Sequence, residues 1–516
     1  MIPFDASGAF RPGAGSNELR GLAVRGAAAT VAASGLGFAV QVVGTVLLAR
    51  LLAPADFGIV TMVSVFSLLL TSFGLNGFTE AVIQFHEIDH YTASNLFWIN
   101  TGAGLVLAIA FAAAGSLLAH FYRNPLVANA ATGLSVGIFI ASASVIHIAF
   151  LKRAMQFAAA SANDLIGRLV YTAVPIFLAL RGWGYWALIG GIVAQQLSMT
   201  IGAWWLCPWI PSSPRRTGKT FAMVRFAAKV YAQFGVAYFQ QNVDNLLIGW
   251  QFNAAALGFY KKAYDLFALT ASQITGPVSN VALATLSRLN DDHVRFRRYL
   301  ASSLGIVAFV GMAASADLTL VGRDVVHLVL GPKWSESGRI FEMLGPGIGA
   351  MLMCSTVGWI HLPIGKPGRW LRWNLVAFAL TASLLLAALP WGPAGVAAAW
   401  TISYWSLLIP AFWYAGRPIG FGVSALIAAI WRYIAAAVVS GFATADIVRY
   451  TSFSDTPQTT SVDLAAIFII SALFVALYLG TVILFHLGLA PLRQLASLMR
   501  ELAPSRKNTT PTPETV

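Results

Sequence analysis

Long apolar stretches alternate with short polar turns over almost the whole chain. Each stretch is close to the roughly 20 apolar residues that a helix needs to cross a hydrocarbon core of about 30 Å. Backbone groups inside lipid must be satisfied within their own segment, which favours helices over open strands. The pattern therefore predicts fourteen membrane-spanning helices, at 27–49, 58–84, 92–118, 127–151, 161–180, 184–206, 226–250, 256–280, 299–321, 337–362, 370–390, 394–416, 423–446 and 462–489.

Composition supports a membrane protein and excludes several other classes. Charged residues make up 10% of the chain, against about 25% in soluble proteins. Cys207 and Cys354 are the only cysteines, too few for a disulfide framework or a cysteine-based metal site. The net charge of +13 is typical of basic cytoplasmic loops that set membrane orientation, and we expect no nucleic-acid partner.

The basic residues also predict the topology. With the N-terminus in the cytoplasm, most of the 33 Lys and Arg residues fall in loops on that side, so we expect both termini to be cytoplasmic. The expected organisation is all-α and polytopic, with two parallel six-helix lobes followed by a C-terminal helix pair. Its parts are a mobile cytoplasmic N-terminus (1–20), an N-terminal lobe (21–208), a cytoplasmic linker (209–224), a C-terminal lobe (225–418), appended spans (419–490) and a cytoplasmic tail (491–516).

An internal repeat underlies the two-lobe prediction. The segment from Gln41 to Gly58 aligns with the segment from Gln241 to Gly258 at an offset of 200 residues, with Gln, Val, Leu, Ala and Gly at matching places. Both segments end one span and turn into the next. Because six crossings separate them, the two copies share one orientation, an arrangement that transporters use for alternating access.

Eight short segments resemble the Wzx-type lipopolysaccharide and exopolysaccharide flippases, nearest their colanic-acid-exporter-like branch. This branch belongs to the multidrug/oligosaccharidyl-lipid/polysaccharide (MOP) exporter superfamily. The matching segments are Leu47–Gly58, Leu96–Asn100, Asn242–Gly249, Leu257–Tyr260 with Ala263-Tyr264, Ile274–Val278 with Leu286–Leu289, and Gly331–Trp334. They cover roughly residues 20–370, and the chain beyond 390 matches only in hydrophobicity.

The resemblance implies a flippase of the bacterial inner membrane and not an enzyme. Its expected cargo is an undecaprenyl-diphosphate-linked oligosaccharide, moved from the cytoplasmic to the periplasmic leaflet. Expected partners are that lipid-linked glycan, the phospholipid bilayer and the polysaccharide polymerase or export machinery. We expect no cofactor. A proton or sodium gradient or the membrane potential would supply the driving force, since the sequence has no Gly-x-x-x-x-Gly-Lys-Ser/Thr phosphate-binding loop.

A diphosphate head group needs a hydrated cationic cavity, because an unpaired charge in hydrocarbon is very costly. Ionisable and polar residues inside spans are therefore the candidates. For the diphosphate and sugar these are Arg25, Arg168, Lys229, Lys261, Lys262, Gln240, Gln241 and Asn242. For ion coupling they are Asp164, Asp244, Asp265 and Glu80. Asp164 lies four residues before Arg168 on one helix face, so this pair could also be purely structural.

Two alternatives remain open at this stage. The first is a multidrug or other lipid exporter of the same superfamily, whose cationic cargo would favour carboxylates in the cavity. The second is an intramembrane metalloprotease, because His86-Glu87-Ile88-Asp89-His90 matches His-Glu-x-x-His. The motif falls in a short polar loop and no third ligand stands out, so we expect no metal.

Overall fold

Helices form all the regular structure in the described part of the chain. The computed structural model describes residues 3–5, 8, 10, 16–85, 87–215, 217–450 and 460–489, with the side chains at 16–29, 272–277, 280, 281, 367 and 460–463 left out of the description. Each of the fourteen predicted spans overlaps at least one helix. The least separated pair of spans is divided at the expected place, where Gly182 and Gly184 adopt positive φ angles between two helices.

The chain folds into two compact units. Unit 1 comprises residues 1–263, 329–340 and 385–396, and unit 2 comprises residues 264–328, 341–384 and 397–516. The helices of unit 1 are α1 (Ser16–Leu51), α2 (Pro54–Leu75), α3 (Phe78–Gln84), α4 (His90–Ala113), α5 (Gly115–Phe121), α6 (Leu126–Ser142), α7 (Val145–Arg153), α8 (Phe157–Leu180), α9 (Tyr185–Leu206) and α10 (Gly218–Gln251), with the start of α11 (Ala254–Arg288), η1 (Pro332–Trp334), the start of α13 (Ser335–Leu344) and η3 (Leu389–Trp391).

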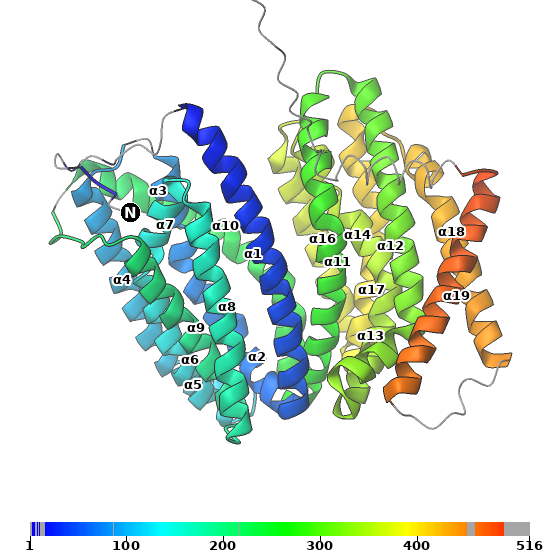
Figure 1. The fold of residues 1–516 in the computed structure, drawn as a ribbon, viewed down its shortest axis with the longest axis horizontal. Helices are drawn as coiled ribbons and strands as arrows, with labels where there is room; N and C mark the ends of the chain where they lie inside the picture. The colour runs from blue at the N-terminus through cyan, green and yellow to red at the C-terminus, as the bar shows by residue number, and fades with distance from the viewer. Residues whose placement is uncertain are drawn as a thin grey trace, which may run out of the picture. The chain divides into compact units, whose positions relative to one another are not determined.

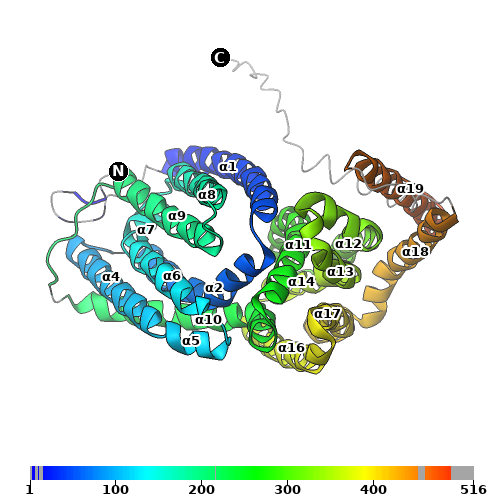
Figure 2. The same cartoon turned by 90° about the horizontal axis from the view of Figure 1, so that it is seen from below.

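Unit 2 holds the remainder of α11 and α13 together with most or all of each later helix, since residues 329–330, 385–388 and 392–396 belong to unit 1. These are α12 (His293–Leu330), η2 (Gly345–Gly347), α14 (Ile348–Ser355), α15 (Gly358–His361), α16 (Pro367–Ala388), α17 (Gly392–Gly416), η4 (Arg417–Ile419), α18 (Val423–Tyr450) and α19 (Thr460–His486). Figures 1 and 2 show α1 running beside α8 in unit 1, and α18 beside α19 in unit 2.

Several predicted spans are broken helices. The span at 58–84 is divided into α2 and α3 at Asn76 and Gly77, and the span at 127–151 bends by 42° between α6 and α7. In the span at 337–362, η2 interrupts the helix at Gly345-Pro346-Gly347. A proline removes one helical hydrogen bond and clashes with the preceding turn, which accounts for the last of these breaks.

By length and apolar composition, ten helical stretches of the described residues can cross a membrane, or eleven if the bent pair α6–α7 is one span. The stretch at 368–419 contains two of the predicted spans. Neither α10 nor α11 is among the candidates, because polar residues interrupt their apolar sequence. The protein is a multi-span membrane protein, and the exact count of fourteen stays a prediction, as do the lobe boundaries.

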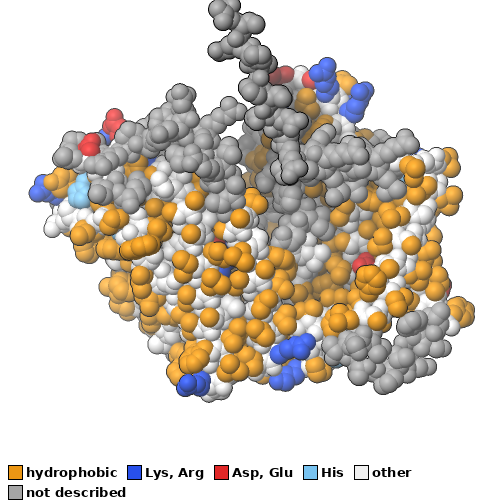
Figure 3. Space-filling view, viewed as in Figure 1, with side chains coloured by type: hydrophobic (Ala, Val, Ile, Leu, Met, Phe, Trp, Pro, Cys, Tyr) orange, Lys and Arg blue, Asp and Glu red, His pale blue; other side chains and the backbone are white. Residues whose placement is uncertain are grey.

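The surface matches a lipid environment. On the face shown in Figure 3, hydrophobic side chains cover the middle of the helices, and most Lys, Arg, Asp and Glu side chains lie towards the ends. Apolar side chains that would be a liability in water, such as Phe468 at 75% exposed, are at home against acyl chains. The few polar groups within the helices are therefore the features that need a functional explanation.

Candidate functional site

Arg168 lies midway along α8 and forms a polar group with α1. Its Nε donates to Asp164 Oδ2 at 2.8 Å, and its Nη1 donates to Gln41 Oε1 on α1 at 3.5 Å. The Arg168 and Asp164 side chains are 41% and 47% exposed. The predicted i,i+4 pair is therefore formed, and it remains accessible. Nη2 has no hydrogen-bond partner among the described residues, so part of the guanidinium fork is open to a ligand.

Small residues on α1 make room for this polar group. A Cβ on Gly37 would come within 2.9 Å of Arg168 Cδ, and one on Gly44 within 2.8 Å of Thr172 Cγ2. Small residues let neighbouring membrane helices approach closely. Sequence reasoning missed Gln41 as a member of the site, although it stands at the head of the internal repeat and that position was itself a clue.

The second group of candidates lies on α10, which packs on α2 through tyrosines. Tyr231 OH donates to Leu69 O at 2.8 Å, and Tyr238 OH donates to Ser64 O at 3.4 Å. At 100° per residue, Lys229, Gln233 and Gln240 fall within about 40° of one another on the opposite face.

This polar face of α10 is open in unit 1. Lys229 and Gln233 are exposed, and Gln240 is half-buried. The Nε2 atom of Gln240 is buried and has no hydrogen-bond partner among the described residues, so Lys229 and Gln233 form the accessible part of this face. Gln233 is a member that sequence reasoning missed, although its spacing of four residues from Lys229 was visible.

Two other polar residues of α10, Asn242 and Asp244, are hydrogen-bonded within the protein. Asn242 Nδ2 donates to Tyr238 O at 2.9 Å and Gln241 is exposed. Asp244 is fully buried, and its Oδ2 accepts a hydrogen bond from Tyr260 OH on α11 at 2.7 Å. The position of Asp244 is thus fixed by a buried hydrogen bond, and its role in ion coupling stays a prediction.

The repeated segments meet at a reciprocal helix crossing in unit 1. A Cβ on Gly58 would overlap the carbonyl oxygen of Ala254, and a Cβ on Gly258 would overlap that of Pro54. These four positions are related by the same offset of 200 residues that the sequence repeat shows. The first turns of α2 and α11 therefore pack backbone to backbone around a local two-fold axis, and only glycine permits this approach.

Residues of a third matching segment complete this crossing. Trp334 is fully buried and its Nε1 donates to Ala49 O at 2.8 Å. Phe57 packs edge-on against the Trp334 ring at 5.4 Å between ring centroids. Lys262 Nζ lies 4.2 Å from the centroid of the Phe57 ring, so this candidate makes a cation–π contact. Three segments far apart in the sequence thus converge at one place.

The remaining candidates are placed by their burial and their helix. Lys261 is half-buried beside Lys262, Asp265 is half-buried on the part of α11 in unit 2, and Glu80 is exposed on α3. The Arg25 side chain lies outside the described residues. The roles assigned to all of these residues stay predictions.

His90, the last residue of the His-Glu-x-x-His segment, is hydrogen-bonded and packed within the protein. His90 Nδ1 accepts a hydrogen bond from Trp209 Nε1 at 3.0 Å, and the ring lies edge-on to Phe4 at 5.5 Å. His86 lies outside the described residues. No group of three or more potential metal ligands occurs among the residues that the structure describes.

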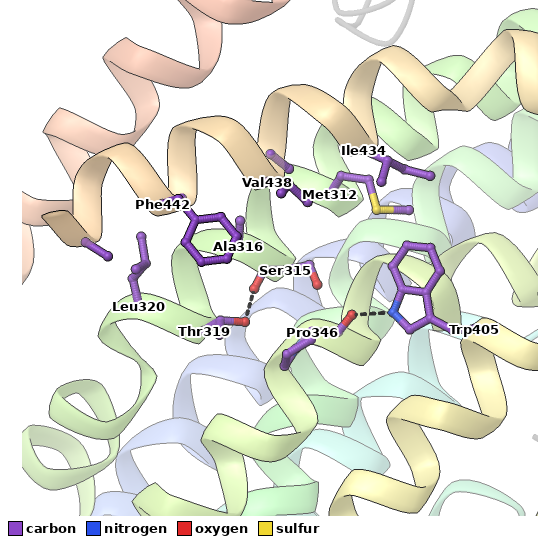
Figure 4. Close-up of a pocket in the computed structure, with 13 residues that line it drawn as sticks. Met312, Ser315, Ala316, Thr319, Leu320, Pro346, Trp405, Ile434, Val438 and Phe442 are labelled. Atoms are coloured by element: carbon purple, nitrogen blue, oxygen red, sulfur yellow. Dashed lines mark hydrogen bonds between the residues drawn. The ribbon is translucent and has the colours of Figure 1, made fainter.

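Unit 2 contains a separate apolar cavity of about 370 Å³ between α12, η2, α17 and α18 (Figure 4). Three polar side chains of its lining donate hydrogen bonds to backbone carbonyl oxygens. Thr319 Oγ1 donates to Ser315 O at 2.6 Å, Ser315 Oγ to Gly345 O at 2.8 Å, and Trp405 Nε1 to Pro346 O at 2.9 Å. With these groups satisfied, the remaining wall of Met312, Ile434, Val438 and Phe442 offers only apolar contact.

Comparison with known families identifies the class of protein. The model of a family described as "Polysaccharide biosynthesis protein" matches residues 47–339, which is more than half of the chain and includes the whole reciprocal crossing. The chain belongs to this family. The resemblance drawn from the sequence motifs is thereby confirmed at the level of this family, and the expectation of a transporter and not an enzyme agrees with it.

Individual relatives agree with the family. The lipopolysaccharide biosynthesis protein WzxC of Escherichia coli (strain K12) is 24% identical over 347 residues, covering 64% of this chain and 68% of WzxC. The succinoglycan biosynthesis transport protein ExoT of Rhizobium meliloti (strain 1021) is 22% identical over 345 residues, covering 67% of this chain and 70% of ExoT.

Solved structures agree on the fold. The lipid II flippase MurJ in an inward closed conformation superposes with a TM-score of 0.69 at 15% identity, over 90% of this chain and 99% of MurJ. An inward-facing multidrug resistance MATE family transporter of the MOP superfamily gives a TM-score of 0.57 at 13% identity, over 75% of this chain and 94% of the transporter. At these identities the likeness concerns the fold alone.

Proposed function

We propose that the protein moves an undecaprenyl-diphosphate-linked oligosaccharide from the cytoplasmic to the periplasmic leaflet of a bacterial inner membrane. The family description, the printed names of WzxC and ExoT, and the fold shared with a lipid II flippase support this proposal. The polyprenyl tail stays in lipid throughout, and the diphosphate and sugars take a hydrated path through the protein. The two lobes predicted at 21–208 and 225–418 open this path alternately.

The observation that carries the proposal is the accessible guanidinium of Arg168 midway along α8. A charged group at that depth is very costly if it faces hydrocarbon, so we infer that it faces water. Its Nε is held by Asp164 and its Nη1 reaches Gln41, while Nη2 has no partner among the described residues. A planar guanidinium with a free edge suits a phosphate oxygen, which it binds by charge-assisted hydrogen bonds.

Lys229 supplies a second positive charge and its neighbours supply amide donors. Lys229, Gln233 and Gln240 on the open face of α10 combine one ammonium with two carboxamides. This combination suits a cargo that carries phosphates and sugar hydroxyls together. We propose that this face lines the path and that Gln241 borders it. Asn242 lies on the side of the helix that carries the tyrosines, so its predicted contact with the cargo falls outside this face.

The energy source follows from the charge of the cargo. A diphosphate leaving a negative interior moves down the electrical gradient, with roughly 2.3 kcal/mol for each unit charge per 100 mV. Asp164, Asp244, Asp265 and Glu80 are the residues that would add coupling to a proton or sodium gradient. Asp164 is the strongest of these, because its partner Arg168 is itself proposed to bind the cargo.

The test is transport by purified protein in sealed vesicles. A fluorescent polyprenyl-diphosphate oligosaccharide with a shortened tail is placed in the bilayer, and a membrane-impermeant quencher reports the fraction that has crossed. Arg168→Gln and Lys229→Gln are compared with Arg181→Gln. Arg181 is the matched control, because its guanidinium lies over the Phe177 ring at 4.8 Å, outside both polar groups.

We expect Arg168→Gln and Lys229→Gln to slow transport on the order of ten-fold or more, since a hydrogen bond to a charged group contributes about 1.5–3 kcal/mol. Arg181→Gln should transport at the wild-type rate. Wild-type rates in both site variants would contradict the proposed path. Transport of a lipophilic cation in place of the anionic lipid would favour the drug-exporter alternative.

A further inference from the structure

The segment that joins α9 to α10 is fastened to α4 by side chains. Asn95 Oδ1 accepts a hydrogen bond from Arg215 N at 2.9 Å, and Asn95 Nδ2 donates to Thr220 Oγ1 at 3.1 Å. Trp98 Nε1 donates to Ser212 O at 2.9 Å. In Figures 1 and 2 this segment runs from α9 past α4 before α10 begins. The flippase mechanism proposed above uses none of these residues.

A cavity of about 670 Å³ lies where this segment meets α4. Its lining is divided into two chemical halves. The polar half has Asn95, Arg215 and Thr217, and the apolar half has Trp98, Ile99 and Phe221. All of these residues belong to unit 1.

Arg215 is the cation of this cavity. Its guanidinium lies over the Tyr91 ring at 4.6 Å from the centroid, and it has no ion-pair partner among the described residues. The neighbouring Lys219 differs, because its Nζ lies 2.6 Å from Glu87 Oε2. The hydrogen bond to Glu87 holds the pKa of Lys219 above its ordinary value. Lys219 is thus neutralised by its own partner, whereas the charge of Arg215 is available.

Hydroxyl groups beside Arg215 can add donors. Thr217 Oγ1 and Thr220 Oγ1 lie 2.6 Å apart, and only one of them donates in that bond. The other hydroxyl hydrogen is free to turn towards a ligand. An arginine with adjacent hydroxyls is a combination suited to phosphate.

The apolar half is unusually open. Trp98 is 46% exposed, Ile99 40% and Phe221 76%. Trp98 and Ile99 lie on α4, which is apolar and long enough to cross a membrane. Trp98 lies about two turns inside the first end of α4, whereas Asn95, which holds the polar half of the cavity, lies nearer that end. The polar half therefore faces the end of the helix, where head groups lie, and the apolar half faces the acyl region.

We propose that this cavity binds an anionic phospholipid of the surrounding bilayer. The phosphate contacts the Arg215 guanidinium and the Thr217 or Thr220 hydroxyl, and an acyl chain covers Trp98, Ile99 and Phe221. A soluble nucleotide or an inorganic anion would leave the apolar half bare. The bound lipid joins α4 to the segment between the two predicted lobes, a position distinct from the cargo path.

The test uses full-length protein in detergent and native mass spectrometry. Dioleoyl-phosphatidylglycerol and dioleoyl-phosphatidylcholine have the same tails, so a difference in adducts reports the head-group charge. The variants are Arg215→Gln and Arg215→Lys. The matched control is Arg417→Gln, because Arg417 also lies over an exposed aromatic ring, 3.8 Å from the Trp413 centroid, outside this cavity.

Wild type should retain one phosphatidylglycerol with at least ten-fold preference over phosphatidylcholine. Arg215→Gln should lose that preference, Arg215→Lys should keep part of it, and Arg417→Gln should behave as wild type. Equal binding of both lipids, or an unchanged adduct in Arg215→Gln, would overturn the proposal. Displacement of the lipid by millimolar inorganic phosphate would also overturn it, since the site would then be a simple anion site. Cargo transport by Arg215→Gln is measured separately, in vesicles of one fixed lipid composition. Lipid binding and cargo transport are then two independent results, so the test of the lipid site stays separate from the test of the flippase function.

Discussion

The reciprocal crossing of α2 and α11 gives the sharpest prediction about stability. Gly58 and Gly258 each face a carbonyl oxygen of the other helix, those of Ala254 and Pro54. Replacing either glycine by alanine adds a single methyl group at a place where the backbones already touch. The obstacle is backbone, which cannot rotate away as a flexible side chain would, so the two helices must separate.

The expected size of the effect follows from this geometry. Adding a methyl group to a well-packed contact costs about 1–3 kcal/mol, so each single variant should be destabilised by that amount. The double variant should be destabilised by less than the sum of the two single effects. One separation of the helices relieves both overlaps, and residues that share a contact commonly couple by about 0.5–3 kcal/mol.

The measurement is thermal unfolding of the full chain in one detergent, for Gly58→Ala, Gly258→Ala and the double variant. Gly102→Ala is the matched control, because Gly102 is a helical glycine of α4 whose added Cβ would meet no atom within 4 Å. The control should be neutral or slightly stabilised, since alanine restricts the unfolded chain more than glycine does.

Two outcomes would refute this reasoning. If Gly58→Ala and Gly258→Ala unfold at the temperature of Gly102→Ala, the crossing is not tightly packed. If the double variant loses the full sum of the single effects, the two overlaps are independent and the local two-fold axis does not describe a single contact.

Three further predictions concern groups near this crossing and at the end of α9. Trp334→Ala should lower the free energy of unfolding by about 3–5 kcal/mol, because it removes a fully buried indole; a change below about 1 kcal/mol in denaturant unfolding would contradict this. Tyr260→Phe should cost about 1.5–3 kcal/mol in the same measurement, because Asp244 loses the donor at 2.7 Å, and an Asp244→Asn background should reduce that cost. Burial raises the pKa of the Cys207 thiol to about 11. In a Cys354→Ser background, maleimide labelling of Cys207 should therefore be slow at pH 7 and should accelerate only towards pH 11. Fast labelling at pH 7 in the folded protein would show that the thiol is accessible.

The helical framework follows from the sequence because a membrane leaves few alternatives. Apolar stretches of spanning length must satisfy their own backbone groups, and this alone locates fourteen helical regions. The ends of the helices are less predictable. α12 runs from His293 to Leu330, well beyond the predicted 299–321, because a helix continues for as long as its backbone bonds are made, whether or not its residues are apolar.

Contacts between polar residues were predictable only where the partners lie a few residues apart in the sequence. Asp164 and Arg168 share a helix face at four residues' separation, so the sequence was sufficient to pair them. The contact of Arg168 with Gln41 joins positions 127 apart and depends on how α1 packs on α8. Arg215 is not among the candidates drawn from the sequence, because nothing in a linker's sequence shows that Asn95 will hold it beside exposed tryptophan and phenylalanine.

The internal repeat shows why equivalent positions need not keep one role. Gly58 and Gly258 are equivalent in sequence and in contact, because each must let the other helix approach. Gln41 and Gln241 are equivalent in sequence and both are exposed, yet Gln41 accepts a hydrogen bond from Arg168, and no side-chain hydrogen bond joins Gln241 to a described residue. A contact on a two-fold axis constrains both copies by the same steric requirement. A residue away from that axis meets different neighbours in each repeat, so its chemistry is free to differ, and the proposed cargo site need not use equivalent residues of the two repeats.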